Sequence, residues 1–485
     1  MKRTTQRIEF GDFQTPDELA MVLCKRLSTM GIQPEVVIEP TCGTGAFVLA
    51  ATKAFPEARD IIGVDVNAEY LATLRRRLAA LPSAHVTLEH ANFFELDWRG
   101  KLRSLSGSLL VIGNFPWVTN ATQGAIGGSN MPEKSNFQNH RGLDAITGKA
   151  NFDISEWMLL EVLDWFQDRS GDVAMLCKTS VARKVLAHIE RRGRMAVQDA
   201  FLVGIDAKKY FGAAVDACLL VIRLAAGRQE VSYDYTVYSD LQDIRGKRVG
   251  HRMGLTVGDL DAFASSSFLL GHSPQKWRSG IKHDASGLME FRRTERGLTN
   301  GLGEVVDLEP TYVYPLMKGS DVASARQEEG RELYVLVTQT YVGEPTERIQ
   351  ELAPATWSYL LNHSRVFDER KSSIYASQPR FSIFGVGDYA FRPWRIAICG
   401  LYKVLRFRLV PPRNGRPVMF DDTVYYLSFN TEYEACQTLE RLNSKPAVQL
   451  LSSLIFWDEK RPIKTSILNT IDWSRLKAMP SRSAP

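Results

Sequence analysis

The feature that most constrains the fold is an alternation of short apolar runs with amphipathic helical patterns over about the first 225 residues. The strand-like runs lie at 36–39, 61–65, 85–89, 109–113, 172–177, 201–205 and 217–224. The helical patterns between them cover 17–29, 46–54, 69–80, 154–166 and 181–191. Strands that alternate with helices are typical of βαβ units, so this region is predicted to form an α/β domain around a mostly parallel sheet.

The pattern changes after about residue 225, where short strand-like pieces separated by proline and glycine replace the alternation. These pieces lie at 332–339, 381–386, 390–399, 404–410 and 422–428, and the helical signal stays weak until 432–442. A second domain of mixed α/β or β-rich structure is therefore predicted. The boundary is expected within 228–239, which gives domains of 1–230 and 231–485.

Positive charge is concentrated in the last third of the chain. Residues 351–485 carry a net charge of +7, against +1 for 1–250 and −3 for 251–350. Within that third, residues 361–416 hold 11 basic and three acidic side chains, with nine aromatic ones interleaved. Basic groups neutralise phosphates and aromatic rings pack on bases and sugars, so this segment is compatible with a nucleic-acid surface. A solvated basic face above an aromatic core explains the same pattern.

Several classes of protein are excluded by what the sequence lacks. The six cysteines form no CxxC pair, which indicates reduced thiols rather than a disulfide framework or a zinc site. The sequence also has no cluster of histidine and cysteine residues that would indicate another metal site. No run reaches the ~18 apolar residues of a membrane helix, and the N-terminus has no apolar signal-peptide core. A cytoplasmic protein with no metal and no membrane partner is expected.

A glycine-containing turn follows the first predicted strand, in the stretch Glu39-Pro40-Thr41-Cys42-Gly43-Thr44-Gly45-Ala46-Phe47. Glycines between a strand and a helix let a ligand approach the backbone closely. The dinucleotide-binding GxGxxG is incomplete, because Val48 stands where its third glycine belongs. Glu39 suits a cofactor with a cationic amino-acid tail, and Asp65, which ends the next strand, is placed to accept hydrogen bonds from ribose hydroxyls. A tight turn with a helix-capping aspartate is the alternative, and the pair at this spacing favours a cofactor pocket.

The fourth predicted strand runs into the tetrapeptide Asn114-Phe115-Pro116-Trp117. The side-chain oxygen of Asn114 and the main-chain carbonyl of Phe115 can both accept hydrogen bonds from an exocyclic amine. Such contacts would hold the lone pair of the amine toward an electrophilic methyl group. Pro116 stiffens the turn, and Trp117 offers a ring face for a flipped base. Taken alone, a turn with a core aromatic is the simpler explanation of the tetrapeptide.

Together these motifs resemble the class I S-adenosylmethionine-dependent methyltransferases, and more narrowly the γ-ordered DNA adenine-N6 methyltransferases of bacterial restriction–modification systems. In that family the cofactor motifs precede the catalytic tetrapeptide, and a C-terminal target-recognition domain follows. The resemblance covers about residues 10–225. It implies a Rossmann-like methyltransferase domain, S-adenosyl-L-methionine as the cofactor, and methylation at N6 of an adenine flipped from double-stranded DNA. It also implies a separately encoded restriction endonuclease or defence-system subunit as a partner.

The resemblance assigns roles to individual residues. The cofactor-binding residues that it implies are Thr15, Pro16, Glu39, Pro40, Cys42, Gly43, Gly45, Phe47, Asp65, Asn92 and Phe93. Phe93 is expected to stack on the cofactor's adenine. The catalytic residues that it implies are Asn114, Phe115, Pro116 and Trp117. Phe211 resembles a second aromatic wall beside the flipped base, and 151–154 resembles a motif that flanks the cofactor pocket.

Two positions depart from the family's pattern. Asn92 stands where an aspartate usually contacts the cofactor's adenine, so weaker cofactor binding is expected. Phe115 replaces a proline, and the ribosomal-RNA adenine dimethylases also have a bulky residue there. An RNA adenine-N6 methyltransferase therefore remains an alternative, together with an N4-cytosine DNA methyltransferase and a catalytically inactive DNA-binding relative. The segment 118–151, which is long for a loop, is expected either to touch DNA beside the tetrapeptide or to act as a lid.

Overall fold

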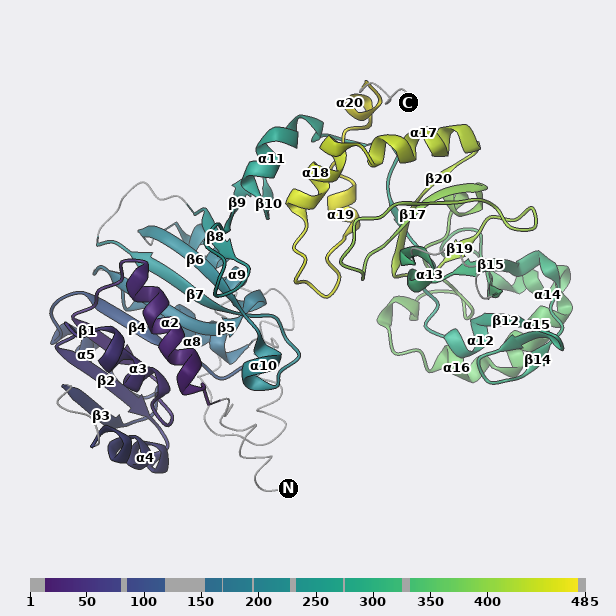
Figure 1. Cartoon of the computed structure of the whole chain (residues 1–485). Coiled ribbons are helices and arrows are strands. Elements are labelled where there is room, and N and C mark those ends of the chain that lie inside the picture. Colours follow the sequence, from purple (N-terminus) through teal and green to yellow (C-terminus); the bar gives the residue numbers. More distant parts are fainter. Residues whose placement is uncertain are drawn as a thin grey trace. The chain divides into compact units, whose positions relative to one another are not determined.

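The computed structural model describes residues 14–79, 85–117, 153–167, 169–193, 196–226, 233–273, 275–324 and 332–478. The chain divides into two compact units, Met1–Thr256 and Val257–Pro485 (Figure 1). The predicted loop at 118–151 lies outside the described residues, and so does residue 152 of the motif that follows it.

Unit 1 is built on one large, mostly parallel sheet. Its strand order is β10-β9-β8-β6-β7-β5-β4-β1-β2-β3. The strands are β1 (Val36–Glu39), β2 (Asp60–Asp65), β3 (Val86–His90), β4 (Leu109–Asn114), β5 (Gly171–Lys178), β6 (Val197–Ile205), β7 (Ala217–Leu224), β8 (Tyr235–Tyr238), β9 (Lys247–Arg252) and β10 (Leu255–Val257). Strands β1 to β5 run parallel, whereas β7 is antiparallel to both β5 and β6. The predicted parallel α/β domain is confirmed, and the order of its strands is new information.

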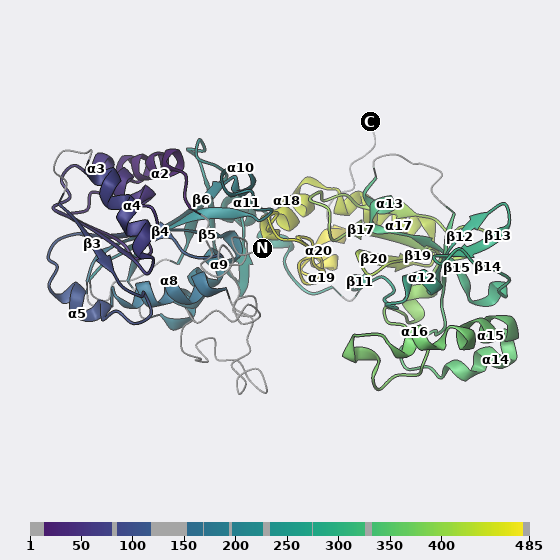
Figure 2. The ribbon, with the colours of Figure 1, turned by 90° about the horizontal axis from the view of Figure 1, so that it is seen from below.

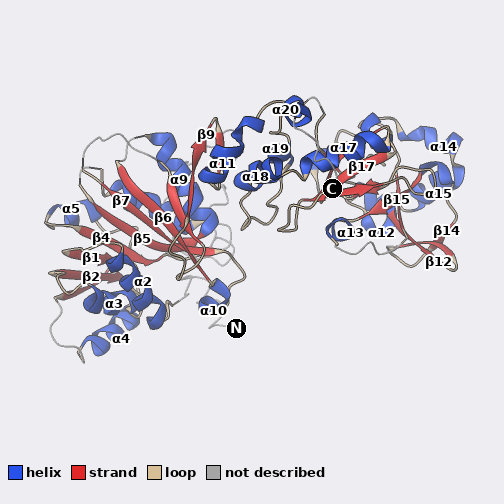
Figure 3. Ribbon diagram, turned by 45° about the horizontal axis from the view of Figure 1, so that its top comes forward, coloured by secondary structure: helices blue, strands red, loops and turns tan. Residues whose placement is uncertain are grey.

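Helices cover both faces of this sheet (Figures 2 and 3). They are α2 (Asp17–Thr29), α3 (Ala46–Ala54), α4 (Ala68–Leu78), α5 (Trp98–Arg103), α8 (Ile154–Asp164), α9 (Thr179–Arg192) and α10 (Ala207–Phe211). Figure 2 shows α2, α3 and α4 on one side of the sheet and α5, α8 and α9 on the other. Successive side chains of a strand point to opposite faces, so strands covered twice need apolar residues throughout. The four residues of β1 are accordingly all buried.

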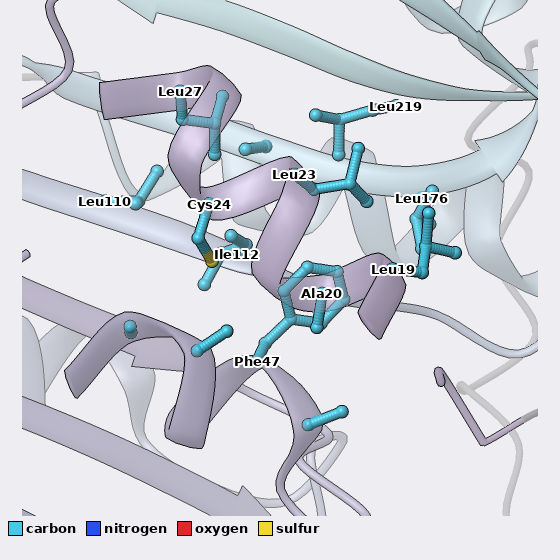
Figure 4. Close-up of a cluster of buried hydrophobic side chains, with 14 of the residues drawn as sticks. Leu19, Ala20, Leu23, Cys24, Leu27, Phe47, Leu110, Ile112, Leu176 and Leu219 are labelled. Atoms are coloured by element: carbon cyan, nitrogen blue, oxygen red, sulfur yellow. The ribbon is translucent and has the colours of Figure 1, made fainter. Parts of the chain in front are cut away.

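The core beneath α2 shows how the sequence selects this arrangement. Leu19, Ala20, Leu23, Cys24 and Leu27 repeat at helical spacing and are fully buried. They pack toward side chains of α3 and of strands β4, β5 and β7 (Figure 4). The acidic side chains of the first turn of α2 lie at the positive end of its dipole. Helix α2 therefore fixes the segment that precedes it against the centre of the sheet.

The boundary between the units differs from the predicted one. The sequence predicts a boundary at 230/231, whereas the first unit extends to Thr256. The reason is that β8 pairs in parallel with β6, and β9 pairs with β8, so both belong to the large sheet. Pairing between strands that are distant in sequence is invisible to local periodicity, and a change of composition near 225 does not mark the end of a sheet.

Unit 2 has a mixed α/β structure, as predicted. A four-stranded sheet has the order β11-β20-β17-β18, and a six-stranded sheet has the order β14-β13-β12-β16-β15-β19. The strands are β11 (Arg278–Ser279), β12 (Glu290–Thr294), β13 (Gly297–Asn300), β14 (Val305–Val306), β15 (Val313–Met317), β16 (Leu333–Leu336), β17 (Trp394–Cys399), β18 (Arg408–Val410), β19 (Met419–Phe420) and β20 (Val424–Phe429). The helices are α11 (Leu260–Ser266), α12 (Ser286–Met289), α13 (Gly319–Ala323), α14 (Ile349–Leu352), α15 (Pro354–Asn362), α16 (Ser364–Asp368), α17 (Glu432–Leu442), α18 (Lys445–Leu454), α19 (Thr465–Leu468) and α20 (Trp473–Ala478).

Three predictions for unit 2 were wrong in detail. Helices α14, α15 and α16 occupy a region whose sequence has only a weak helical signal, because their few buried residues gain their packing from the six-stranded sheet. The predicted strand at 381–386 is absent, since Gly385 has a φ of +81° and only an isolated bridge joins Phe384 to Lys282. The predicted strand at 404–410 is reduced to β18, and residues 401–404 before it lie in an exposed loop.

Candidate active site

The last residues of five parallel strands form one edge of the large sheet. They are Glu39, Asp65, His90, Asn114 and Lys178, which end β1, β2, β3, β4 and β5. The strand order reverses between β1 and β4, which are neighbours in the sheet. In open α/β sheets a ligand binds beyond the carboxyl ends of the strands at such a switch point. The glycine turn after β1 and the tetrapeptide after β4 both lie there.

The glycine turn adopts a conformation that only glycine takes without strain. Gly43 and Gly45 have φ angles of +52° and +88°. A Cβ atom on Gly45 would lie 2.1 Å from Cδ1 of Leu74 in α4. Asp65 holds the turn, because its Oδ2 accepts a hydrogen bond from the Gly43 amide at 2.7 Å and its Oδ1 accepts one from Asn67 at 2.8 Å. The acid predicted to bind ribose therefore also organises the backbone of the turn.

Glu39 is buried directly beneath the turn. Its side chain is 4% exposed, and Oε2 accepts a hydrogen bond from the Val48 amide at 2.9 Å. Burial raises the pKa of Glu39 well above its ordinary value, the hydrogen bond from Val48 opposes that shift, and the charge of Asp65 adds to it. Glu39 thus ties β1 to the first turn of α3.

The segment that precedes α2 contacts both functional loops. Gln14 Oε1 accepts hydrogen bonds from the Thr44 amide at 3.2 Å and from the Thr44 hydroxyl at 3.0 Å. The adjacent Thr15 accepts a hydrogen bond at Oγ1 from Nδ2 of Asn114, at 3.3 Å. The tertiary structure therefore brings the segment before α2, the glycine turn and the tetrapeptide together. Gln14 lies in the stretch Phe13-Gln14-Thr15-Pro16, which resembles the family's N-terminal cofactor motif, but only Thr15 and Pro16 were predicted as site residues.

Phe115 anchors the tetrapeptide from below. Its ring is 1% exposed and meets the ring of Phe93 at 5.6 Å between centroids, close to edge-to-face. Phe93 itself is 5% exposed and also packs against Trp98 and Trp165. Its ring therefore has little free face, which argues against the predicted stacking on the cofactor's adenine. The unusual Phe115 is explained as a core aromatic that leaves its main chain at the edge of the sheet.

Two further residues at this edge bear on the cofactor pocket. Val66 directly follows Asp65 and is 40% exposed, an unusual position for an apolar side chain at the end of a buried strand. Val66 was not a predicted site residue. Its position directly after the acid that ends β2 was the feature of the sequence that could have indicated it. Asn92 forms a local turn, since its Oδ1 accepts from the Phe94 amide at 3.2 Å and its Nδ2 donates to Glu95 at 2.9 Å. The side chain predicted to contact the cofactor is therefore engaged within its own loop.

The aromatic pair predicted to enclose a base is brought together. The rings of Trp117 and Phe211 lie 5.0 Å apart between centroids, with an angle of 63° between their planes. They come from the turn after β4 and from the end of α10, almost a hundred positions apart in the sequence. Trp117 is 6% exposed. The two rings touch edge-to-face and do not form a parallel slot.

The remaining residues that were predicted to bind the cofactor make structural contacts within the protein. Pro16 precedes α2 as its cap residue. Pro40 is buried, and the Cys42 amide donates to the Val64 carbonyl at 2.8 Å. Phe47 is fully buried and belongs to the core cluster beneath α2. These residues shape the turn from within the protein.

An ion pair borders the site on the side of β5. Lys178 Nζ lies 2.5 Å from Oδ2 of Asp153, and both side chains are largely buried. Asp153 also caps α8 by accepting from the amide and hydroxyl of Ser155. The pair joins the start of α8 to the end of β5. Lys178 lies in none of the predicted motifs.

No group of three or more metal-ligating side chains occurs among the described residues. In the same part of the chain, none of the helices has the length and apolar character needed to cross a membrane.

The fold and this edge of the sheet define the class of protein. The switch point joins a glycine turn with two positive φ angles, two acidic strand ends and an Asn-Phe-Pro-Trp turn, and this combination defines a class I S-adenosylmethionine-dependent methyltransferase. The chain is 46% identical over 467 residues to the type II methyltransferase M.NspV of Nostoc sp. (strain ATCC 29411 / PCC 7524), covering 96% of each chain. It therefore belongs to the family of type II methyltransferases, and its cofactor is S-adenosylmethionine.

One solved structure shares the fold. The type IIL restriction–modification enzyme MmeI, determined in complex with DNA, matches with a TM-score of 0.51 at 12% identity, over 98% of this chain and 67% of MmeI. A methyltransferase subunit of a type I restriction–modification system from Streptococcus thermophilus matches with a TM-score of 0.32 at 16% identity, over 47% of each chain. No protein-family profile matches the chain.

Proposed function

We propose that this chain transfers the methyl group of S-adenosylmethionine to N6 of an adenine that is extruded from double-stranded DNA. The observation that carries the proposal is the position of Asn114 at the switch point, hydrogen-bonded to Thr15 and adjacent to the strand that leads into the glycine turn. In this proposal Asn114 binds the substrate amine, and the methyl donor binds at the neighbouring glycine turn.

The residues around the glycine turn fit that donor. Bound S-adenosylmethionine would supply a methyl group on a positively charged sulfur. Asp65 at the end of β2 and the exposed Val66 beside it suit a ribose and the face of an adenine, respectively. A cationic amino-acid tail near Glu39 would favour the ionised carboxylate and so offset the cost of burying that charge.

The tetrapeptide supplies the contacts that an exocyclic amine needs. Because Nδ2 of Asn114 donates to Thr15, the amide is turned so that Oδ1 can accept from the substrate amine. The main-chain carbonyl of Phe115 is a second acceptor at the same turn. Two acceptors orient the amine and stabilise the positive charge that develops on nitrogen during the transfer.

The aromatic pair supports base extrusion. A base within a duplex is out of reach of a site at the edge of a sheet, so the enzyme must take it out of the stack. Trp117 and Phe211 offer ring faces beside the tetrapeptide. A base that enters between them must replace their edge-to-face contact, which is consistent with a pocket that opens only for substrate.

Unit 2 is proposed to be the target-recognition domain, and DNA to be the partner. MmeI, whose fold this chain shares, was determined in complex with DNA. A separately encoded restriction endonuclease would complete a restriction–modification pair, as the family of type II methyltransferases suggests.

The test is transfer of a labelled methyl group from S-adenosylmethionine to unmethylated genomic DNA, followed by mass spectrometry of the nucleosides. N6-methyladenine is the expected product. N4-methylcytosine would replace the base assignment, because the same tetrapeptide can hold the cytosine amine. Label in structured RNA and none in duplex DNA would overturn the DNA assignment. Cofactor binding without transfer to either would identify an inactive relative.

A further inference from the structure

The loop between β17 and β18 in unit 2 exposes three largely apolar side chains. Leu401, Tyr402 and Val404 are 37%, 45% and 52% exposed. They are nearly consecutive, so they form one apolar tip rather than scattered surface residues. A contiguous exposed apolar patch on a folded domain usually marks an interaction site.

The two ends of this loop are firmly held. Gly400 donates to the Thr423 carbonyl at 2.8 Å, and a Cβ there would meet the ring of Tyr425 at 2.7 Å. At the other end the Phe407 ring packs on Trp277 at 5.5 Å between centroids. Arg406 donates to the Ala323 carbonyl at 3.2 Å. A loop that is fixed at both ends presents its tip at low entropic cost on binding.

The chain that carries the loop is rich in positive charge, although Asp388, Asp421 and Asp422 flank it. Residues 389–420 contain seven basic side chains and no acidic one. They are Arg392, Arg395, Lys403, Arg406, Arg408, Arg413 and Arg416. Within the described residues, none of the seven forms an ion pair with a carboxylate; the hydrogen bonds of Arg395, Arg406, Arg408 and Arg416 go to main-chain carbonyls. Arg395 is 1% exposed and lies in the core, so the surface charge comes from the other six. Carbonyls orient a guanidinium but do not cancel its charge, so this surface retains its attraction for anions.

An apolar tip among basic side chains that form no ion pair within the described residues fits one kind of partner. Cations bind the phosphate backbone, and apolar or aromatic side chains pack on sugars, on base edges or between base steps. An acidic protein would satisfy the charge but gives no reason for a protruding Leu-Tyr-Lys-Val tip that is rooted at both ends.

We propose that the tip Leu401–Val404 enters a groove of the target DNA, with Tyr402 against the bases or sugars and Lys403 on a phosphate. The proposal rests on the proposed function, because it assumes that duplex DNA is the substrate. It assigns the DNA contact to one loop of unit 2, whereas the basic composition of 361–416 pointed to no single element.

The test compares Tyr402→Ala and Lys403→Ala with two matched controls in unit 2, Tyr433→Ala at an exposed tyrosine of α17 and Lys445→Ala at the start of α18. Binding is measured, over a range of salt concentrations, to a DNA duplex that carries the sequence methylated by the wild type. Tyr402→Ala should raise Kd about 10-fold or more at fixed salt. Lys403→Ala should reduce the slope of log Kd against log salt by about one. Both controls should match the wild type, and cofactor affinity should stay unchanged in all variants.

The outcomes separate this proposal from the proposed function. If the wild type methylates DNA and both tip variants bind it with unchanged Kd and salt slope, the tip is not a DNA contact, although the enzyme acts on DNA. If the wild type neither binds nor methylates duplex DNA, both proposals are wrong. Equal losses in the tip variants and the controls would show a general loss of charge or folding and would also overturn the assignment.

Discussion

The amide nitrogen of Asn114 donates a hydrogen bond to the hydroxyl of Thr15 across 3.3 Å, although 99 positions separate the two residues in the sequence. Thr15 belongs to the segment before α2, whose neighbour Gln14 binds the glycine turn. One short segment therefore connects the end of β4 with the turn after β1. Because the nitrogen of the Asn114 amide is held, its oxygen has a defined direction.

This contact predicts that Thr15 positions Asn114. Thr15→Val keeps the shape of the side chain but removes the acceptor, and it should lower kcat by about 10- to 100-fold through loss of orientation. Thr15→Ser keeps the hydroxyl and should restore most of that loss. Cofactor Kd, measured by calorimetry, should change less than kcat in both variants. An unchanged kcat in Thr15→Val would show that the hydrogen bond does not orient Asn114.

Asn114→Ala should abolish methyl transfer while leaving cofactor affinity nearly unchanged, because the residue binds the amine and not the donor. Single-turnover kinetics and cofactor titration check the two parts separately. The opposite pattern is expected for Asp65→Lys, which removes the acceptor for the Gly43 amide and should weaken cofactor binding. Substantial turnover by Asn114→Ala would show that Asn114 is not needed for methyl transfer. Full cofactor affinity in Asp65→Lys would show that Asp65 does not bind the ribose of the cofactor.

Gly45→Ala should destabilise the protein by about 3 kcal/mol, since it adds left-handed strain and a clash with Leu74. Gly193→Ala is the matched control, because Gly193 also has a positive φ of +58° but has no described atom within 4 Å of the added Cβ. The control should cost only the strain of about 1–2 kcal/mol. Denaturant unfolding measures both. Equal losses would show that Leu74 moves aside without cost.

Glu39 should make folding and cofactor binding depend on pH in opposite directions. Its pKa in the folded protein lies above its ordinary value of 4.5, so the folded state binds the proton more tightly than the unfolded state. The stability associated with this proton is complete below 4.5 and is lost as the pH rises through the raised pKa. Glu39→Gln should remove that loss, and the unfolding free energy of the two proteins measured between pH 5 and 9 checks it.

Cofactor affinity should instead increase with pH in the wild type if a cationic tail binds the ionised Glu39. Glu39→Gln should lose this dependence. A wild-type affinity that is flat over the same range would show that Glu39 only supports the turn through Val48.

The contact between Trp117 and Phe211 predicts how the base is held. Trp117→Ala should reduce kcat/KM by about 10- to 100-fold, because base–aromatic stacking contributes about 1–3 kcal/mol. Trp117→Phe should retain more activity. A duplex with 2-aminopurine at the target adenine should become more fluorescent when the wild type binds, and less so with Trp117→Ala. Bright fluorescence with the alanine variant would show that extrusion does not need this ring.

The sequence by itself determined most of what lies within single elements. The spacing of buried residues in α2, the alternation of strands and helices up to β7, and helix α17 were all readable from local pattern. The glycine turn and the tetrapeptide were readable as well, because each is a short motif whose chemistry depends on adjacent residues. Membership of a methyltransferase family followed from these motifs and is confirmed by the relative with 46% identity.

Tertiary structure alone decided how distant segments meet. The order of the strands, with β8 beside β6, moved the boundary from 230 to Thr256. Packing placed Phe93 in a core of aromatic rings around Phe115. The hydrogen bond from Asn114 to Thr15 likewise has no signature in either motif. The physical reason is common to all three: local periodicity reports which side chains prefer to be buried, whereas the packing of the whole sheet determines against what they are buried.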